Sequence, residues 1–246
     1  MELSNPKEYL IEQGLGILFE MEEQSVVSGN NPIKINSVDL ARIHQLIIQR
    51  RPFTTLEFGT GFSTLVIAHA LKQNKKAYEG NSNKPLLKNP PPFLHYSVDA
   101  NEFWLNNTQK MLPSELKEFV VFCHSSCEVV LFNGQLSHQY TKLPDIDPQF
   151  IYLDGPDPND VKGNVNGLTF SNSTRTVMSS DLLMMESIFA PGLFILVDGR
   201  TNNARFLQRN FQRNYDMVHY PETDVTTFEL KEPYLGKRNK DQNFRY

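Results

Sequence analysis

Several carboxylate residues follow short apolar runs, at positions where the strands of an α/β sheet would end. Glu57 lies beside the end of one run, and Asp99 ends a second. Asp154 and Asp198 end two further runs. Because ligands of open α/β sheets bind outside the carboxyl ends of the strands, we expect these side chains to face one site. Carboxylates there could accept hydrogen bonds from hydroxyl groups or take up a proton.

The first of these runs turns through two glycines into a predicted helix, with the sequence Glu57-Phe58-Gly59-Thr60-Gly61-Phe62-Ser63. Glycine permits a tight turn and a close approach of the backbone to a ligand. Free amide groups at a helix start can bind a carboxylate or a phosphate. A dinucleotide site would continue to a third small residue where this chain has Thr64, and Glu57 would repel a pyrophosphate. The turn therefore favours a ligand with an ammonium group.

This turn resembles the acidic, glycine-rich first motif of the class I S-adenosylmethionine-dependent methyltransferases. The resemblance covers about residues 54–230, and Val98-Asp99-Ala100 is similar to the family's acidic position for the ribose hydroxyls. Cys123-His124-Ser125 falls where the family places residues around the adenine. The alternatives are a helix cap for Asp99 and turn residues for His124 and Ser125. The resemblance implies S-adenosylmethionine as cofactor, bound by Glu57, Gly59, Thr60, Gly61, Ser63, Asp99, Ala100, His124 and Ser125.

The methyl acceptor is expected beside the ends of the fourth and fifth core strands. Asp154 is the candidate general base, and a capping or loop carboxylate is the alternative. The corner Asp154-Gly155-Pro156 looks closer to enzymes that act on sugar hydroxyls than to amino-methylating enzymes. The candidate substrate-binding residues are Asp157, Arg175, Asp198 and Arg200. The two guanidinium groups could bind a carboxylate or phosphate of the acceptor, and an exposed surface charge is the alternative for each.

Asp154 and Asp198 also resemble the carboxylates of the metal-dependent catechol-type O-methyltransferases. That family follows its second aspartate with asparagine, whereas this chain has Gly199. We therefore nominate no metal ligands and rank a divalent cation below transfer without metal.

The sequence thus predicts an enzyme that transfers a methyl group from S-adenosylmethionine to a small polar acceptor such as a sugar or glycan precursor. One alternative is an NAD(P)-dependent oxidoreductase or sugar-nucleotide enzyme on a Rossmann fold. Another is a non-catalytic binding protein that keeps the cofactor fold.

Composition narrows the class of protein. The 246 residues carry a net charge of −4, which gives no broad basic face for nucleic acid. The start lacks the pattern of a secretory signal and no segment is apolar for the length of a membrane span, so we expect a cytoplasmic protein.

Cys123 and Cys127 are expected to be small, partly buried residues near a strand end. A homodimer, or a lid over the site, built by the amino-terminal helices is left open.

These residues require a Rossmann-like α/β fold: a mostly parallel sheet of about seven strands, the last antiparallel, flanked by helices. We expect one domain over residues 1–246, with amino-terminal helices in 1–50, the core in 51–230 and a tail in 231–246. The expected strands are 54–58, 94–98, 119–123, 149–153 and 193–197, followed by a hairpin of 215–220 and 225–230. The expected helices are 7–23, 37–50 with Ser37 as cap, 62–73, 102–111, 177–189 and 201–213. Residues 75–92 and 155–176 are expected to be loops, the second of them functional.

Overall fold

The main sheet of the computed structural model, which describes residues 4–27, 34–84, 87 and 90–242, has seven strands. In spatial order they are β3 (Val120–His124), β2 (Leu94–Asp99), β1 (Thr54–Phe58), β6 (Phe150–Leu153), β8 (Phe194–Asp198), β10 (Val225–Leu230) and β9 (Tyr215–Tyr220). The strands from β3 to β8 are parallel, and β10 is antiparallel to both of its neighbours. The expected mostly parallel sheet and its closing hairpin are confirmed.

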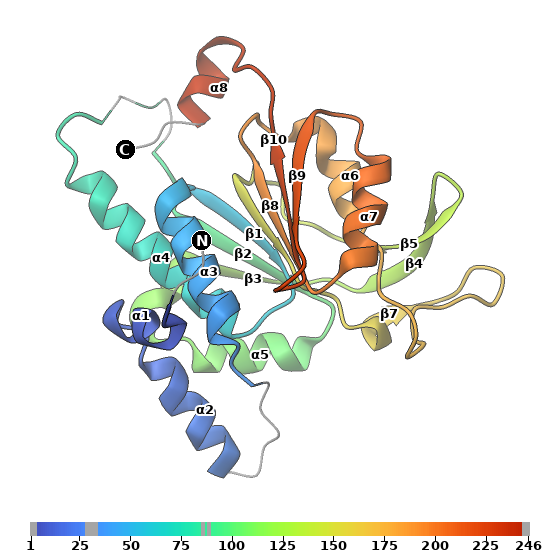
Figure 1. Ribbon diagram of the computed structural model, residues 1–246, viewed down its shortest axis with the longest axis horizontal. Helices are drawn as coiled ribbons and strands as arrows, with labels where there is room; N and C mark the ends of the chain where they lie inside the picture. The colour runs from blue at the N-terminus through green and yellow to red at the C-terminus, as the bar shows by residue number, and fades with distance from the viewer. Residues whose placement is uncertain (1–3, 28–33, 85–86, 88–89, 243–246) are drawn as a thin grey trace.

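Helices cover both faces of this sheet (Figure 1). On one face lie α3 (Ser37–Arg50) and α4 (Phe62–Glu79), and α1 (Pro6–Glu12) packs against α3. The other face carries α6 (Asp181–Met185) and α7 (Thr201–Asn210). The remaining helices are α2 (Ile17–Val27), α5 (Glu102–Met111) and α8 (Gly236–Gln242), with short 3-10 helices η1 (Ser114–Phe119), η2 (Pro158–Asp160) and η3 (Glu186–Ile188). No helix within the described ranges is both long and apolar enough to cross a membrane.

Some helix boundaries differ from the sequence-based prediction. The single helix expected over 7–23 is two helices, because Gly14 between them has φ +85°. Asn36 and not Ser37 caps α3, through bonds from the amides of Val38 and Asp39 at 3.1 and 3.5 Å. The helix expected over 177–189 shrinks to α6 and η3, because residues 177–180 are not helical and Ser179 forms an isolated bridge with His138. The segments expected as a loop from 75 and as a plain tail from 231 contain the end of α4 and all of α8.

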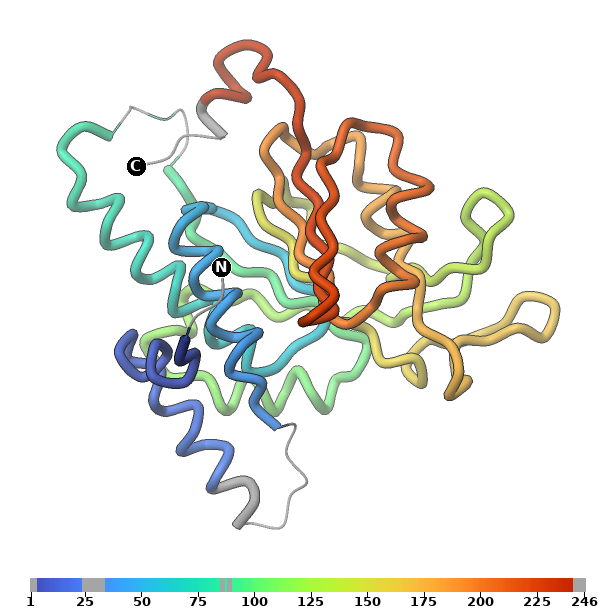
Figure 2. Tube along the Cα trace, in the orientation of Figure 1, coloured from blue at the N-terminus to red at the C-terminus, as the bar shows by residue number. Residues whose placement is uncertain are grey.

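A second, smaller sheet was not predicted. Its strands, in spatial order, are β5 (Gln135–Tyr140), β4 (Cys127–Phe132) and β7 (Val161–Lys162). Asn133 and Gly134, with φ of +48° and +71°, make the turn between β4 and β5. The chain trace shows this hairpin reaching away from the main sheet (Figure 2). Because β7 pairs with β4, the segment 155–176 is anchored in the small sheet.

Alternating residues of the central strands face two different cores. Leu56 and Phe58 of β1 belong to the core shared with the small sheet, α6 and α7. Phe150 and Tyr152 of β6 belong to the core under α3 and α4. The chain runs outward from β1 to β3 and returns to β6 on the other side of β1, so the strand order reverses between β1 and β6. Such a reversal, the switch point of the sheet, opens a crevice at the carboxyl ends of the two strands.

Candidate active site

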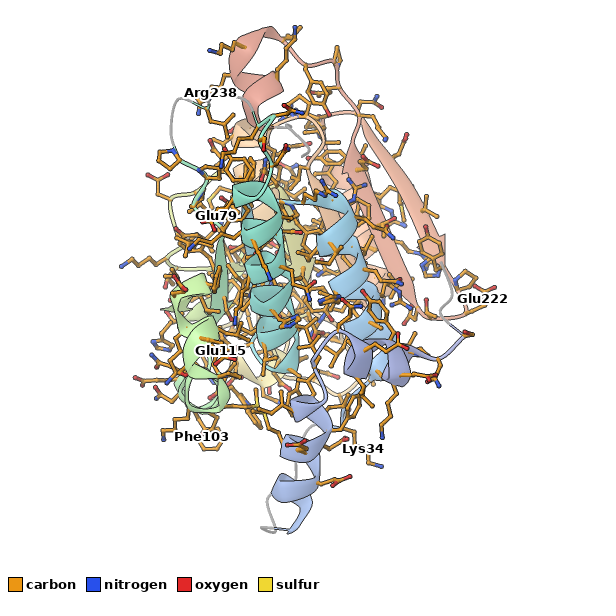
Figure 3. All side chains as sticks on the ribbon, turned by 90° about the vertical axis from the view of Figure 1, so that its left-hand side faces the viewer. Lys34, Glu79, Phe103, Glu115, Glu222 and Arg238 are labelled. Atoms are coloured by element: carbon orange, nitrogen blue, oxygen red, sulfur yellow. The ribbon has the colours of Figure 1, made fainter. Side chains whose placement is uncertain are left out.

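The carboxyl ends of the parallel strands meet at the end of the molecule where α4 begins. Figure 3 shows Lys34, just before α3, and Phe103, in the first turn of α5, at that end, with Glu79 of α4 toward the opposite end. The starts of α3, α4 and α5 therefore surround the strand ends. This edge carries most of the site residues expected from the sequence.

Glu57 is fully buried and organises the turn after β1. One carboxylate oxygen accepts a hydrogen bond from the Ser63 hydroxyl, and the other accepts from Thr64 at 2.6 Å. The same second oxygen lies 3.0 Å from Nε2 of His95, whose Nδ1 is 2.9 Å from the Thr55 hydroxyl. A buried carboxylate needs such partners, so the network explains how Glu57 is accommodated.

This network gives Glu57 a structural role that the sequence did not indicate. Its side chain has 1% of its surface exposed and three partners within the chain. A direct contact with a ligand's ammonium group, as expected from the sequence, stays a prediction. In this conformation, Glu57 fixes the start of α4 through Ser63 and Thr64.

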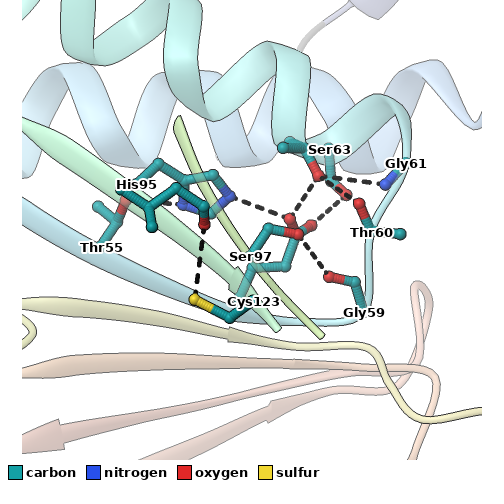
Figure 4. Close-up of polar contacts among 11 residues, drawn as sticks. Thr55, Gly59, Thr60, Gly61, Ser63, His95, Ser97 and Cys123 are labelled. Atoms are coloured by element: carbon teal, nitrogen blue, oxygen red, sulfur yellow. Dashed lines mark hydrogen bonds and ion pairs between the residues drawn. The ribbon is translucent and has the colours of Figure 1, made fainter. Parts of the chain in front are cut away.

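The turn after β1 and the corner after β6 touch through their backbones. A Cβ placed on Gly155 would lie 2.6 Å from the Gly59 nitrogen and 2.8 Å from the Phe58 carbonyl carbon. Gly59 has φ +108°, and its carbonyl accepts a bond from the Ser97 hydroxyl at 3.0 Å (Figure 4). Only glycine at 155 permits this approach.

Gly61 differs, since a Cβ there would meet no described atom within 4 Å. Its amide donates to the Thr64 hydroxyl at 3.1 Å, while Thr60 and Thr64 hydroxyls lie 3.5 Å apart. The side of Gly61 where a side chain would stand is open, and a ligand could approach the backbone there.

The residues expected around the ribose and adenine lie together. Asp99 is largely buried, its Oδ1 accepts from the Asn101 amide at 2.7 Å, and its carbonyl accepts from the Ser125 amide at 3.1 Å. His124 Nε2 lies 3.3 Å from the Ala100 carbonyl. Burial raises the pKa of Asp99 to about 6. Asp99 is thus ionised at neutral pH, with capacity to accept further bonds.

On the other side of the switch point, Asp154 and Asp198 lie beside Arg200. The Arg200 guanidinium donates to the carbonyls of Asp154 and, at 3.3 Å, of Pro156, and lies 3.7 Å from Oδ1 of Asp154. Tyr152 donates to Asp198 at 2.7 Å. Arg200 therefore holds the corner after β6, and acceptor binding by this residue stays a prediction.

The Asp154 side chain is half exposed, and the neighbouring protein displaces part of the water around it. The loss of surrounding water raises its pKa to about 7, Arg200 opposes the rise, and the charge of Asp198 adds to it. Burial and the nearby Asp198 likewise raise the pKa of Asp39 in the first turn of α3. The amino-terminal helix α3 thus brings a third carboxylate to this edge.

Two expected substrate residues lie outside this group. Asp157 caps η2 by accepting from the Asn159 amide at 2.8 Å. Arg175 donates to the Thr169 carbonyl at 2.6 Å and closes the loop that contains both. Within the described ranges, no three His, Cys, Asp or Glu residues are placed to hold a metal ion.

Sequence reasoning missed three partners of the site carboxylates, Thr64, His95 and Tyr152, and also missed Asp39 as a further carboxylate at this edge. One signal was available for His95. A buried glutamate on β1 requires a polar partner, and His95 is a polar residue within the neighbouring apolar strand.

No protein-family model and no curated protein sequence matches the chain. Solved structures do match. The O-methyltransferase from Bacillus cereus in complex with SAH is 11% identical, with a TM-score of 0.51 over 92% of this chain and 96% of that one. Cofactor-bound Rv0187 from MTB is also 11% identical, with a TM-score of 0.52 over 94% of this chain and 100% of that one. This confirms the expected fold class: the chain has the Rossmann-like α/β fold of the Bacillus cereus O-methyltransferase.

Proposed function

We propose that this protein is an S-adenosylmethionine-dependent methyltransferase that methylates a hydroxyl oxygen of a small polar acceptor, such as a sugar or glycan precursor. The observation that carries the proposal is the pairing of two features at the switch point. The glycine turn after β1 leaves an open backbone at Gly61, and Asp99 ends the neighbouring strand. The likeness in fold to an O-methyltransferase complexed with SAH supports it.

The described residues fit this cofactor. Asp99 can accept bonds from two ribose hydroxyls, and the open side of Gly61 allows the amino-acid half to lie against the turn. The sulfonium centre of the cofactor, when bound, supplies a methyl group that an oxygen nucleophile can attack in line.

Asp154 is the proposed base that takes the proton of the acceptor hydroxyl. Its pKa of about 7 lies near neutral pH, where a general base is most effective. Arg200 fixes the Asp154 backbone, so the carboxylate is held beside the cofactor turn by the Gly59–Gly155 contact. The acceptor class rests on the similarity of the Asp154-Gly155-Pro156 corner to enzymes acting on sugar hydroxyls.

Calorimetric titration with S-adenosylhomocysteine tests the cofactor half of the proposal. We expect saturable binding to the wild type and much weaker binding to Asp99→Asn. Melting curves with S-adenosylhomocysteine and with NAD separate the methyltransferase from an oxidoreductase, because only the ligand that binds the folded state raises the melting temperature. Stabilisation by NAD alone would reject the proposal.

A further inference from the structure

Arg200 and several buried polar side chains of β5 and α7 have atoms without a hydrogen-bond partner among the described residues. These atoms are both ring nitrogens of His138, Oη of Tyr140, Nδ2 of Asn203 and Nε of Arg200. His138 and Asn203 are fully buried, and Tyr140 is 4% exposed. Buried polar atoms are nearly always paired, so an unpaired group in one place requires a cause.

His138, Tyr140 and Asn203 gather between β5 and α7, and we name these three residues the inner polar cluster. The rings of His138 and Tyr140 are 6.3 Å apart. Asn203 joins them through Ser179, whose amide donates to Asn203 at 2.9 Å and whose hydroxyl donates to Asp181 at 3.3 Å. Asp181 in turn lies 3.9 Å from Nε2 of His138.

Arg200 ties the inner polar cluster to the candidate active site. Its two terminal nitrogens hold the Asp154 and Pro156 carbonyls, while its buried Nε has no partner. Burial lowers the pKa of His138 to about 3, and the charge of Arg200 adds to this shift. His138 is therefore neutral, with one donor and one acceptor nitrogen.

The unpaired atoms define the chemistry of the missing partner. The Asn203 amide, Arg200 Nε and Tyr140 hydroxyl all donate, and only Tyr140 and one nitrogen of His138 can accept. The partner is therefore rich in acceptor oxygen. The cluster is buried, and burial penalises a further charged group, so an uncharged oxygen fits better than a carboxylate.

We propose that the inner polar cluster binds an uncharged hydroxyl or carbonyl oxygen of the methyl acceptor, with Tyr140, His138 and Asn203 as its recognition residues. This inference rests on the proposed function, because the link through Arg200 places the cluster beside Asp154. A polyhydroxylated acceptor meets both needs: one hydroxyl at Asp154 and another oxygen in the cluster.

The test compares Tyr140→Phe with a matched control, Tyr215→Phe. Each change deletes one buried hydroxyl that has no partner among the described residues, and Tyr215 lies elsewhere, stacked on Phe211 at 4.2 Å. The probe is methyl α-D-glucopyranoside, titrated by calorimetry in saturating S-adenosylhomocysteine. We expect the wild type and Tyr215→Phe to bind the glucoside alike and Tyr140→Phe to bind roughly tenfold more weakly. Affinity for S-adenosylhomocysteine should be equal in all three proteins.

Failure of this inference is distinct from failure of the proposed function. Absence of S-adenosylhomocysteine binding by the folded wild type counts against the function itself. Two other results overturn only the cluster assignment. In one, the wild type binds S-adenosylhomocysteine but not the glucoside. In the other, Tyr140→Phe binds the glucoside as tightly as the wild type does.

A second measurement needs no acceptor. Removing a hydroxyl that lacks a partner in the free protein should leave the melting temperature unchanged or raise it, in both variants. A clear drop in Tyr140→Phe alone would mean that a fixed structural partner, such as ordered water, already occupies the cluster, and would overturn the proposal.

Discussion

Replacing Gly155 by alanine tests the contact between the turn after β1 and the corner after β6. The new Cβ would stand 2.6 Å from the Gly59 nitrogen and 2.8 Å from both the Gly59 Cα and the Phe58 carbonyl carbon. All three are backbone atoms, so no flexible side chain can move aside. Overpacking of this kind costs about 1–3 kcal/mol, which for a chain of this size lowers the melting temperature by roughly 2–12 °C.

The matched control is Gly61→Ala in the same turn. A Cβ at Gly61 meets nothing within 4 Å, and its φ of 161° is extended backbone. Thermal melts of the free proteins should therefore show a loss of stability in Gly155→Ala and little change in Gly61→Ala. In calorimetry, Gly61→Ala should bind S-adenosylhomocysteine more weakly, because the methyl group fills the open side of the turn. A Gly155→Ala protein that melts with the wild type would refute the close approach of the two backbones.

Three further predictions concern charge. Asp154→Asn should lower the turnover of methyl transfer roughly 10²-fold to 10⁴-fold and leave the affinity for S-adenosylhomocysteine unchanged. The wild-type rate should rise with pH through about 7, and a flat pH profile would contradict a base at Asp154. Asp99→Asn should weaken S-adenosylhomocysteine binding roughly 10-fold to 100-fold, measured by calorimetry, and an unchanged affinity would exclude the ribose contact. Burial, with the neighbouring His69, lowers the pKa of His44 from 6.5 to about 3, so the unfolded chain takes up this proton first as the pH falls below 6.5. Urea unfolding should measure the difference in free energy of unfolding between the wild type and His44→Gln. The advantage of the wild type should shrink by up to about 1.4 kcal/mol per pH unit between pH 6 and 4. A difference that stays constant with pH would refute a buried neutral histidine.

The sequence predicted the main sheet well because its central strands are buried on both sides. A fully buried parallel strand leaves a short apolar run between polar segments, as in β1, β6 and β8, and such a run is visible without the fold. The β4–β5 hairpin was missed although Asn133-Gly134 is a strong hairpin signal. Its strands carry polar residues such as His138, which is buried where Asp181 of α6 lies 3.9 Å from its ring.

For the candidate site, the sequence indicated which strand ends carry carboxylates. It could not indicate how those carboxylates are paired, because pairing depends on contacts between elements far apart in the chain. His95 reaches Glu57 across neighbouring strands, and Arg200 spans the corner at Asp154 instead of extending toward solvent. The unpaired atoms of the inner polar cluster follow from the same kind of contact and have no sequence signature.

The position of α3 has a consequence for how this protein can be divided. Burial is the main cause of the raised pKa of Asp154, and the charge of Asp39 in the first turn of α3 makes a smaller contribution in the same direction. A fragment that began at β1 would keep every strand of the sheet but lose this charge, so the Asp154 carboxyl would give up its proton at a lower pH. The amino-terminal helix is in this sense an electrostatic part of the candidate active site, although it lies outside the sheet.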